Sequence, residues 1–429
     1  MKRLASILLW SVIAAAFIGP GTVTTAASAG ATYGLSLLWA LLFSTAACLV
    51  LQEASARLTV VSGRNLGQAL RDQYRAGPQK GAVLFLVLGA IVAGCAAYEA
   101  GNILGGVSGA VMVTGWPAHL LTLVSGVIAG ALLWRSPPQT VARSLSLVVA
   151  IMGLAFLCTA VLQRPPLGEI VRASLVPSSP RGSGLLILGL VGTTVVPYNL
   201  FLGSGIAAGQ ELRDLRLGLM VAVGLGGLIS MAVLVTGTAV EGSFSFLALS
   251  EVLSLELGSW AANLFALGLL GAGLSSAIAA PLAAAVTARS LLQEGGEDDR
   301  WSPTDWRYRS VWIGVLMVGL GFGLSGVRPV PAIILAQALN GFLLPLVSVF
   351  LFLAVNDRRL MGDAVNGRLA NVATLGVVWV AMLLGVTAVS RAVSSASDLP
   401  PLGGFWLVVV SSFVMLLLVV PAYRSRRGQ

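Results

Sequence analysis

Two long apolar segments of this chain are interrupted by proline, and they occupy matching positions in its two halves. In residues 17–25 the interruption is Pro20, with a glycine on either side, and in residues 191–199 it is Pro197. Proline removes a backbone donor and clashes with the preceding turn, so each helix must open at this point. Within a membrane, freed backbone groups are tolerated only where they line a cavity or pack against protein. Paired interrupted helices therefore predict the substrate site of a secondary transporter.

The composition indicates a membrane protein with many spans. Hydrophobic residues make up 57% of the 429 residues and only 10% are charged, a balance that soluble globular domains do not have. A helix needs about 20 apolar residues to cross roughly 30 Å of hydrocarbon. By this measure we predict twelve spans, at residues 5–31, 35–60, 82–109, 115–134, 142–163, 183–209, 216–240, 257–288, 311–326, 330–355, 370–390 and 403–423.

The net charge of +9 is distributed as in a membrane protein. If both termini are cytoplasmic, the inner segments hold 21 of the 26 lysines and arginines, and the outer segments hold only Arg164, Arg172, Arg181, Arg328 and Arg391. This asymmetry follows the positive-inside rule. We therefore expect a monomeric, multi-pass protein of a bacterial-type inner membrane with both termini cytoplasmic. Its partners are the lipid bilayer and a small inorganic ion, not nucleic acid.

The positions of the interrupted helices predict an internal repeat. They are the first and sixth spans, so each repeat holds five spans, and an odd number forces the repeats into opposite orientation. We predict an all-α, LeuT-type fold with a first inverted repeat at residues 1–165 and a second at 183–356. Additional helices and a cytoplasmic tail follow at 370–429. The connections at 164–182 and 291–310 are expected to be loops or surface helices.

Other segments of the chain carry recognisable motifs, at residues 29–39, 51–52, 56–58, 62–66, 192–199, 273–276 and 356–362. Together these segments resemble the Nramp family of proton-coupled divalent-metal transporters, and the resemblance covers most of the chain. It implies the LeuT-type fold with discontinuous first and sixth helices. In that family the first broken helix carries an Asp-Pro-Gly-Asn motif, whose Asp and Asn bind the metal, and the sixth carries Met-Pro-His-Asn.

The residues at the centre of this chain depart from the family pattern. The first motif reads Gly-Pro-Gly-Thr, so Gly19 replaces the carboxylate and Thr22 replaces the amide. In the sixth helix, Val196 replaces the methionine thioether and Tyr198 replaces the histidine. Gln337 in the tenth span does match a polar position of the family near the site.

A third departure lies in the third span. The family uses acidic residues there for proton movement, whereas this chain places Leu88, Cys95 and Tyr98 at those positions. Glu99 is one step away, so a shift of register would restore one acid. Without such a shift, we expect that the third span does not carry protons.

The altered motif favours an anion over a metal ion. Transition metals need thioether, imidazole or carboxylate ligands, and Mg²⁺ is usually held by carboxylates. A half-helix that begins at a proline instead presents N–H groups and the positive end of its dipole, and threonine hydroxyls add donors. Bicarbonate is the leading candidate, while nitrate, formate and halide remain open. The alternative is a divalent cation, Mn²⁺ or Mg²⁺, carried with or without protons.

The candidate substrate-binding residues come from both breaks and from the tenth span. They are Gly19, Pro20, Gly21, Thr22, Thr24, Thr25, Thr193, Thr194, Val196, Pro197, Tyr198, Gln337 and Asn340. Ser275 and Ser276 in the eighth span resemble the hydroxyl pair that binds Na⁺ in LeuT-type folds, so Na⁺ is the candidate coupling ion for an anion. We expect no other cofactor and no bound catalytic metal.

Other polar groups in the spans have simpler explanations. Glu53 and Arg57 are four residues apart on one helix face and are expected to pair near the cytoplasmic end. The three cysteines, Cys48, Cys95 and Cys158, are expected to be small buried residues. An enzyme is not expected, because one histidine cannot form a two-histidine zinc motif and no Gly-x-Ser-x-Gly turn occurs. A channel remains a less favoured alternative to alternating access.

Overall fold

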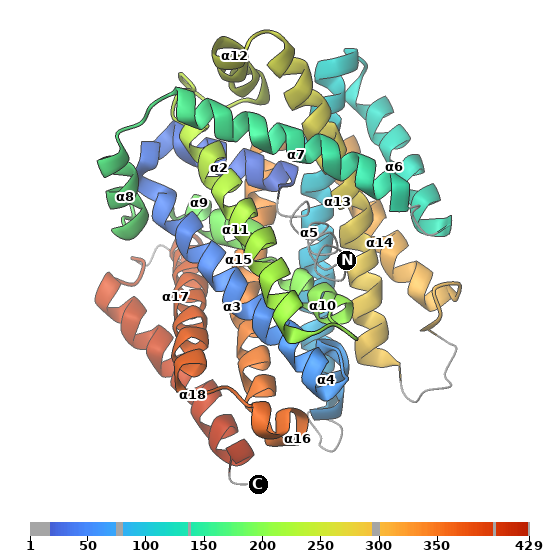
Figure 1. Ribbon diagram of the computed structural model, residues 1–429, viewed down its shortest axis with the longest axis vertical. Helices are drawn as coiled ribbons and strands as arrows, with labels where there is room; N and C mark the ends of the chain where they lie inside the picture. Colours follow the sequence, from blue (N-terminus) through green and yellow to red (C-terminus); the bar gives the residue numbers. More distant parts are fainter. Residues whose placement is uncertain (1–17, 74–79, 136–138, 294–300, 398–399, 428–429) are drawn as a thin grey trace.

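The computed structural model describes residues 18–73, 80–135, 139–293, 301–397 and 400–427, and every regular element within these ranges is a helix. Figure 1 shows the helices packed into one bundle. They are α2 (Pro20–Tyr33), η1 (Gly34–Leu37), α3 (Leu38–Ser62), α4 (Leu66–Gln73), α5 (Lys80–Thr114), α6 (Ala118–Arg135), α7 (Gln139–Leu162), α8 (Leu167–Leu175), α9 (Gly184–Thr194), α10 (Pro197–Ile206), α11 (Leu212–Gly237), α12 (Phe246–Leu257), α13 (Trp260–Leu292), α14 (Trp306–Leu324), α15 (Pro329–Val355), α16 (Arg358–Met361), η3 (Gly362–Ala364), α17 (Arg368–Ser397) and α18 (Gly404–Arg427).

Each predicted span coincides with a helix, except that the sixth falls on the two half-helices α9 and α10 and the described part of the first starts at residue 18. By length and apolar composition, nine helical segments in the described ranges qualify as membrane spans. One of them, Pro20–Ser62, runs through the bend at η1 and accounts for two predicted spans. The other two predicted spans are α14 and α18, of which α18 has a shorter apolar stretch, Gly404–Val420.

Four of the short helices lie toward the two ends of the bundle. In Figure 1, α8 and α12 lie toward one end, and α4 and α16 lie toward the other, together with the C-terminus. The connection at 164–182 contains the surface helix α8, as expected, whereas α12 was not predicted. The α12 segment is apolar but short, and Ser245 caps it by accepting a hydrogen bond from Ala248 N at 3.1 Å.

Small residues allow the helices around the first break to approach closely. A Cβ atom on Gly30 of α2 would clash with the carbonyl oxygen of Leu234 on α11. A Cβ atom on Gly105 of α5 would likewise clash with Pro20. Gly106 and Gly273 pack α5 against α13 in the same way. Such contacts drive helix association in lipid, where apolar burial provides little energy.

The cysteines are only partly as expected. Cys48 and Cys95 are buried, but Cys158 on α7 is exposed on the surface of the bundle. A hydrophobic residue on a spanning helix can face lipid as readily as the protein interior, and span position alone does not distinguish the two. All three cysteines are free.

Candidate ion-binding site

The first break lies where α2 begins. Gly19 precedes the helix in extended conformation (φ −88°, ψ 174°), and Pro20 is its first residue, where a missing N–H costs nothing. The Gly19 carbonyl accepts a hydrogen bond from Val23 N at 3.2 Å. The N–H groups of Gly21 and Thr22 therefore lie in the first turn, at the positive end of the helix dipole.

The second break separates α9 from α10, as the sequence predicts. The helical hydrogen bonds of α9 end at Val195, whose N–H donates to Val191 O at 2.8 Å. Val195 (φ −101°, ψ 75°) and Val196 (φ −79°, ψ 120°) leave the helical conformation, and α10 then begins at Pro197. The predicted interruption is therefore a non-helical stretch between two half-helices.

A hydroxyl–hydroxyl contact joins the two breaks. Thr22 Oγ1 and Thr193 Oγ1 are 2.8 Å apart, although the residues are 171 positions apart in the chain. Both side chains are buried, at 1% and 0% exposure. The structure thus brings together two predicted site residues from opposite halves of the chain.

Several polar groups on α2 and on the facing helix α15 are buried and have no hydrogen-bond partner among the described residues. They are the hydroxyls of Thr24 and Thr25 and both amide atoms of Gln337. Gln337 lies against the first break, because a Cβ atom on Gly21 would clash with its amide. Leaving a buried polar group unpaired costs about 1–3 kcal/mol, so this group of atoms is suited to a polar ligand.

Two tyrosines lie edge to face beside the breaks. Tyr98 of α5 and Tyr198 of α10 have ring centroids 5.5 Å apart at 85°. The Tyr98 hydroxyl is 4.0 Å from the Cβ position of Gly19, so it lies beside the first break. Tyr98 was predicted only as a lost acidic position, and the structure adds it to the candidate site.

Of the two candidate sodium residues, Ser276 lies beside the first break. Ser276 Oγ is 3.5 Å from the Cβ position of Gly19 and has no hydrogen-bond partner among the described residues. Ser275 donates its hydroxyl proton to Ala272 O at 3.1 Å. Its oxygen lone pairs remain able to coordinate a cation.

The remaining predicted residues contribute less. The Thr194 hydroxyl donates to Leu190 O at 2.9 Å, so it is satisfied within its own helix. Asn340 donates to Ala336 O at 3.2 Å and approaches Gly94 O at 3.4 Å, while its Oδ1 has no partner among the described residues. Val196 is a buried apolar side chain and offers no ligand atom.

Glu99 lies on a different face of α5 from Tyr98. It is fully buried, and a Cβ atom on Gly319 of α14 would lie 2.6 Å from its Cγ. Its Oε2 approaches Asn102 Nδ2 at 3.4 Å, and its Oε1 has no partner among the described residues. The Cγ of Glu99 therefore packs against α14, whereas the hydroxyl of its chain neighbour Tyr98 lies beside Gly19 at the first break.

This placement predicts that Glu99 is not needed for ion coupling. We expect Glu99→Gln to change the initial rate of substrate uptake by less than about twofold, because the amide is isosteric and the breaks are untouched. The measurement is uptake into proteoliposomes with and without an imposed pH gradient. Gradient-driven uptake that disappears in Glu99→Gln would contradict the prediction, and the parent under the same gradient is the control.

The predicted Glu53–Arg57 pair is present, with Arg57 Nε and Glu53 Oε1 3.2 Å apart. The sequence did not indicate its extension to a second arginine. Arg216 of α11 lies 2.7 Å from the same Glu53 oxygen through Nη2. Arg57 also donates to Ala364 O at 2.8 Å and to Asn366 Oδ1. Ala364 belongs to η3, which directly follows α16, so these contacts lie near α16.

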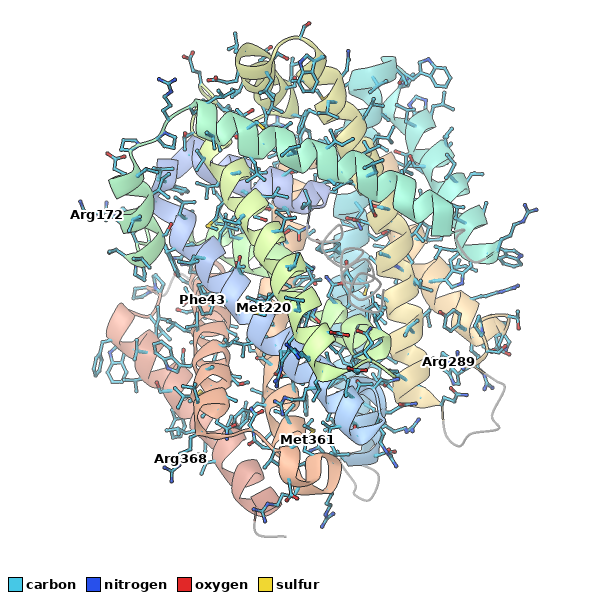
Figure 2. All side chains as sticks on the ribbon, viewed as in Figure 1. Phe43, Arg172, Met220, Arg289, Met361 and Arg368 are labelled. Atoms are coloured by element: carbon cyan, nitrogen blue, oxygen red, sulfur yellow. The ribbon has the colours of Figure 1, made fainter. Side chains whose placement is uncertain are left out.

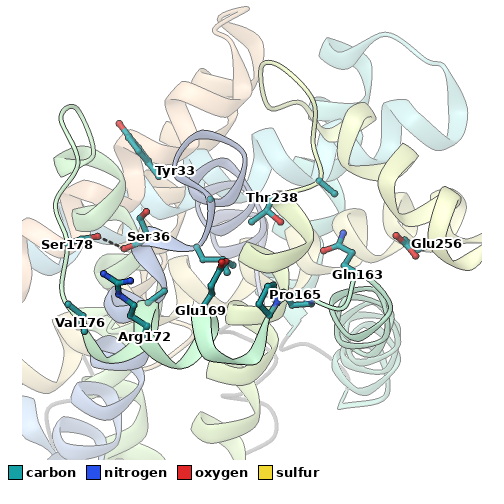
Figure 3. Close-up of a pocket in the computed structure, with 15 residues that line it drawn as sticks. Tyr33, Ser36, Gln163, Pro165, Glu169, Arg172, Val176, Ser178, Thr238 and Glu256 are labelled. Atoms are coloured by element: carbon teal, nitrogen blue, oxygen red, sulfur yellow. Dashed lines mark hydrogen bonds between the residues drawn. The ribbon is translucent and has the colours of Figure 1, made fainter.

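A separate cavity of about 880 Å³ opens near α8, far from this charged group. Figure 3 shows Glu169 and Arg172 of α8 below the bend that holds Tyr33 and Ser36. Ser178 donates to Ser36 O at 2.8 Å and accepts from Trp39 Nε1 at 2.8 Å through its carbonyl. The cavity lining includes none of the break residues, so this cavity is not the predicted site.

Comparison with known proteins agrees with the resemblance seen in the sequence. Residues 11–391 match the model of the family described as natural resistance-associated macrophage protein-like (Nramp). A divalent metal cation transporter MntH of Deinococcus radiodurans is 31% identical over 391 residues, which cover 86% of each chain. The MntH of Yersinia enterocolitica is 26% identical, covering 88% of this chain and 92% of its own.

Solved structures show the same fold. A variant of the Eremococcus coleocola manganese transporter superposes with a TM-score of 0.72 at 18% identity, covering 98% of this chain and 92% of its own. Mhp1, a nucleobase-cation-symport-1 family transporter, superposes with a TM-score of 0.56 at 17% identity, covering 99% of this chain and 92% of its own. The LeuT-type fold predicted from the two broken helices is thereby confirmed. The chain belongs to the Nramp family and is a secondary membrane transporter.

Proposed function

We propose that this Nramp-family transporter carries a small inorganic anion, with bicarbonate the leading candidate, through the space between the two breaks. The observation that supports this proposal is the Thr22–Thr193 hydroxyl pair at 2.8 Å, together with the unpaired hydroxyls of Thr24 and Thr25 on α2 and the unpaired amide of Gln337. A hydroxyl or an amide N–H can donate to an oxyanion, and the first turn of α2 adds N–H groups and a positive dipole end.

The same residues are poor ligands for a bare divalent cation. The family's carboxylate position is Gly19, and its thioether position is Val196. No group of three or more His, Cys, Asp or Glu side chains is close enough to hold a metal ion anywhere in the described ranges. A divalent ion in a buried site without anionic ligands pays a large desolvation cost, which neutral hydroxyls repay only in part.

The second candidate function is transport of a divalent metal cation, Mn²⁺ or Mg²⁺. The names of the relatives favour it, because both MntH proteins are described as divalent metal cation transporters and the structural neighbour as a manganese transporter. None of these names refers to bicarbonate or sodium. Here the amide and hydroxyl oxygens of Gln337, Thr22 and Thr193 would serve as neutral ligands to a partly hydrated ion.

Uptake into proteoliposomes distinguishes the two candidates. The full chain is reconstituted, and uptake of radiolabelled bicarbonate is compared with that of Mn²⁺ and Mg²⁺ at a fixed pH, with protein-free vesicles as control. We expect saturable bicarbonate uptake and no saturable uptake of either metal. Saturable Mn²⁺ or Mg²⁺ uptake without bicarbonate uptake would overturn the anion proposal and establish the cation alternative.

We further propose Na⁺ as the coupling ion, held by Ser275 and Ser276 next to Gly19. We expect Ser276→Ala to raise the Na⁺ concentration for half-maximal uptake about tenfold, as loss of one ligand to a charged ion costs about 1.5 kcal/mol or more. Ser230→Ala on α11 is the matched control, because its buried hydroxyl only bonds Gly226 O at 2.8 Å. Equal bicarbonate uptake in sodium and choline media would refute the sodium assignment. That result would not bear on the anion site.

A further inference from the structure

A second cavity lies between α3, α11 and α17, outside the break region. Its volume is about 400 Å³. Most of its lining is apolar, from Leu49, Val50, Ala54, Leu219, Met220, Ala370 and Ala373, and its polar lining residues are Glu53, Arg57, Arg216, Asn366 and Thr374. Met220, labelled in Figure 2, lies where α11 borders this cavity and is 57% exposed. The cavity therefore opens at the surface of the bundle and has one charged end.

The charged end carries an excess of positive charge. Among the described lining residues Glu53 is the one acid, and it is shared by two guanidinium groups. Arg57 Nε lies 3.2 and 3.3 Å from the two carboxylate oxygens, and Arg216 contacts Oε1 through Nε at 3.0 Å and Nη2 at 2.7 Å. One carboxylate cannot balance two guanidinium groups, so one positive charge is left over.

The two arginines have different surroundings. Arg57 is buried and uses its other nitrogens on Ala364 O and Asn366 Oδ1. The Arg216 side chain is 53% exposed, and within the described ranges its hydrogen bonds go to Glu53. Arg57 therefore holds the carboxylate in place, while Arg216 can turn its exposed nitrogens toward an outside anion.

The position along the helices matches the level of lipid headgroups. Arg57 lies five residues before the end of α3 at Ser62, and Arg216 lies four residues after the start of α11 at Leu212. Both are thus within about two turns of a helix end. The positive-inside rule predicts that this end faces the cytoplasm, where anionic lipids are concentrated.

We propose that this cavity binds an anionic phospholipid. Its phosphate contacts Arg216, and an acyl chain occupies the apolar part beside Met220 and Ala373. An acyl chain explains the apolar lining, and the uncompensated guanidinium explains a preference for a negative headgroup. A phosphate ion alone would leave the apolar part of the cavity without a partner.

Native mass spectrometry of the full chain tests this assignment. The protein is released from nanodiscs of phosphatidylcholine mixed with phosphatidylglycerol, and the bound lipids are counted. We expect the parent to retain phosphatidylglycerol, and Arg216→Gln to lower that retention about tenfold. Arg213→Gln, the same charge change three residues earlier on α11 and outside the cavity lining, is the control and should retain it fully.

Two further variants separate lipid binding from folding. Arg216→Lys keeps the positive charge and should retain most of the phosphatidylglycerol. Ala373→Phe keeps the charges of Glu53, Arg57 and Arg216 but fills the apolar part of the cavity, so this variant should lose the lipid. The proposal is wrong if Arg216→Gln and Ala373→Phe both bind phosphatidylglycerol like the parent, or if phosphatidylcholine is retained equally well. Displacement of the lipid by millimolar inorganic phosphate would instead identify a free-phosphate site and overturn the lipid assignment.

Discussion

Thr22→Val is expected to weaken the apparent affinity for bicarbonate about ten- to a hundredfold while expression stays normal. The Thr22 hydroxyl lies 2.8 Å from that of Thr193 and joins the two breaks, so this substitution removes a polar group from the centre of the proposed pocket. A hydrogen bond to a charged group contributes about 1.5–3 kcal/mol, which corresponds to that range. The measurement is the bicarbonate concentration for half-maximal uptake in proteoliposomes. Thr193→Val should act in the same direction.

Thr194→Val is the matched control for these two variants. This variant carries the same substitution one residue from Thr193, but the Thr194 hydroxyl already donates a hydrogen bond to Leu190 O at 2.9 Å. We expect an affinity within about twofold of the parent, since no donor to the substrate is removed. If Thr22→Val and Thr193→Val both transport bicarbonate like Thr194→Val, the substrate pocket lies elsewhere. If all three lose activity together, the effect is structural.

Gly30→Ala is expected to destabilise the fold by about 1–3 kcal/mol or more, because no room exists for an added methyl group. Its Cβ atom would clash with the backbone carbonyl of Leu234, and Gly237 of α11 is in similarly close contact with Ala27. A backbone atom cannot rotate away, so α2 and α11 would have to separate. The measurement is the thermal unfolding midpoint in detergent.

The control is Gly224→Ala, also on α11. Nothing lies within 4 Å of the Cβ position of Gly224, so the added methyl group enters open space. Because alanine favours a helix by about 1 kcal/mol over glycine, we expect an unchanged or slightly higher midpoint. An equal fall of the midpoint in both variants would show that the α2–α11 contact is not the cause.

The elements of this fold could be predicted from local sequence properties. Apolar stretches of sufficient length identify the spans, because the bilayer fixes the length of helix that must cross it. Pro20 and Pro197 predict both helix breaks, because proline removes a helical hydrogen bond and clashes with the preceding turn. Proline alone is not sufficient, since α13 and α15 continue through Pro281 and Pro345. The i,i+4 spacing likewise predicts the Glu53–Arg57 pair, which the structure contains at 3.2 Å.

Tertiary packing decided what the candidate site contains. The sequence indicated threonines at both breaks, but not that Thr22 and Thr193 touch while Thr194 bonds within its own helix. It left open which face of α5 points inward, and the structure turns Tyr98 toward the breaks and Glu99 toward α14. It also did not indicate that Arg216 joins Glu53 from 163 residues away. Helix formation depends on residues that are close in the chain, so the sequence reveals it. Which side chains meet between two helices depends on how the helices are rotated and how closely they approach, and only the assembled bundle determines this.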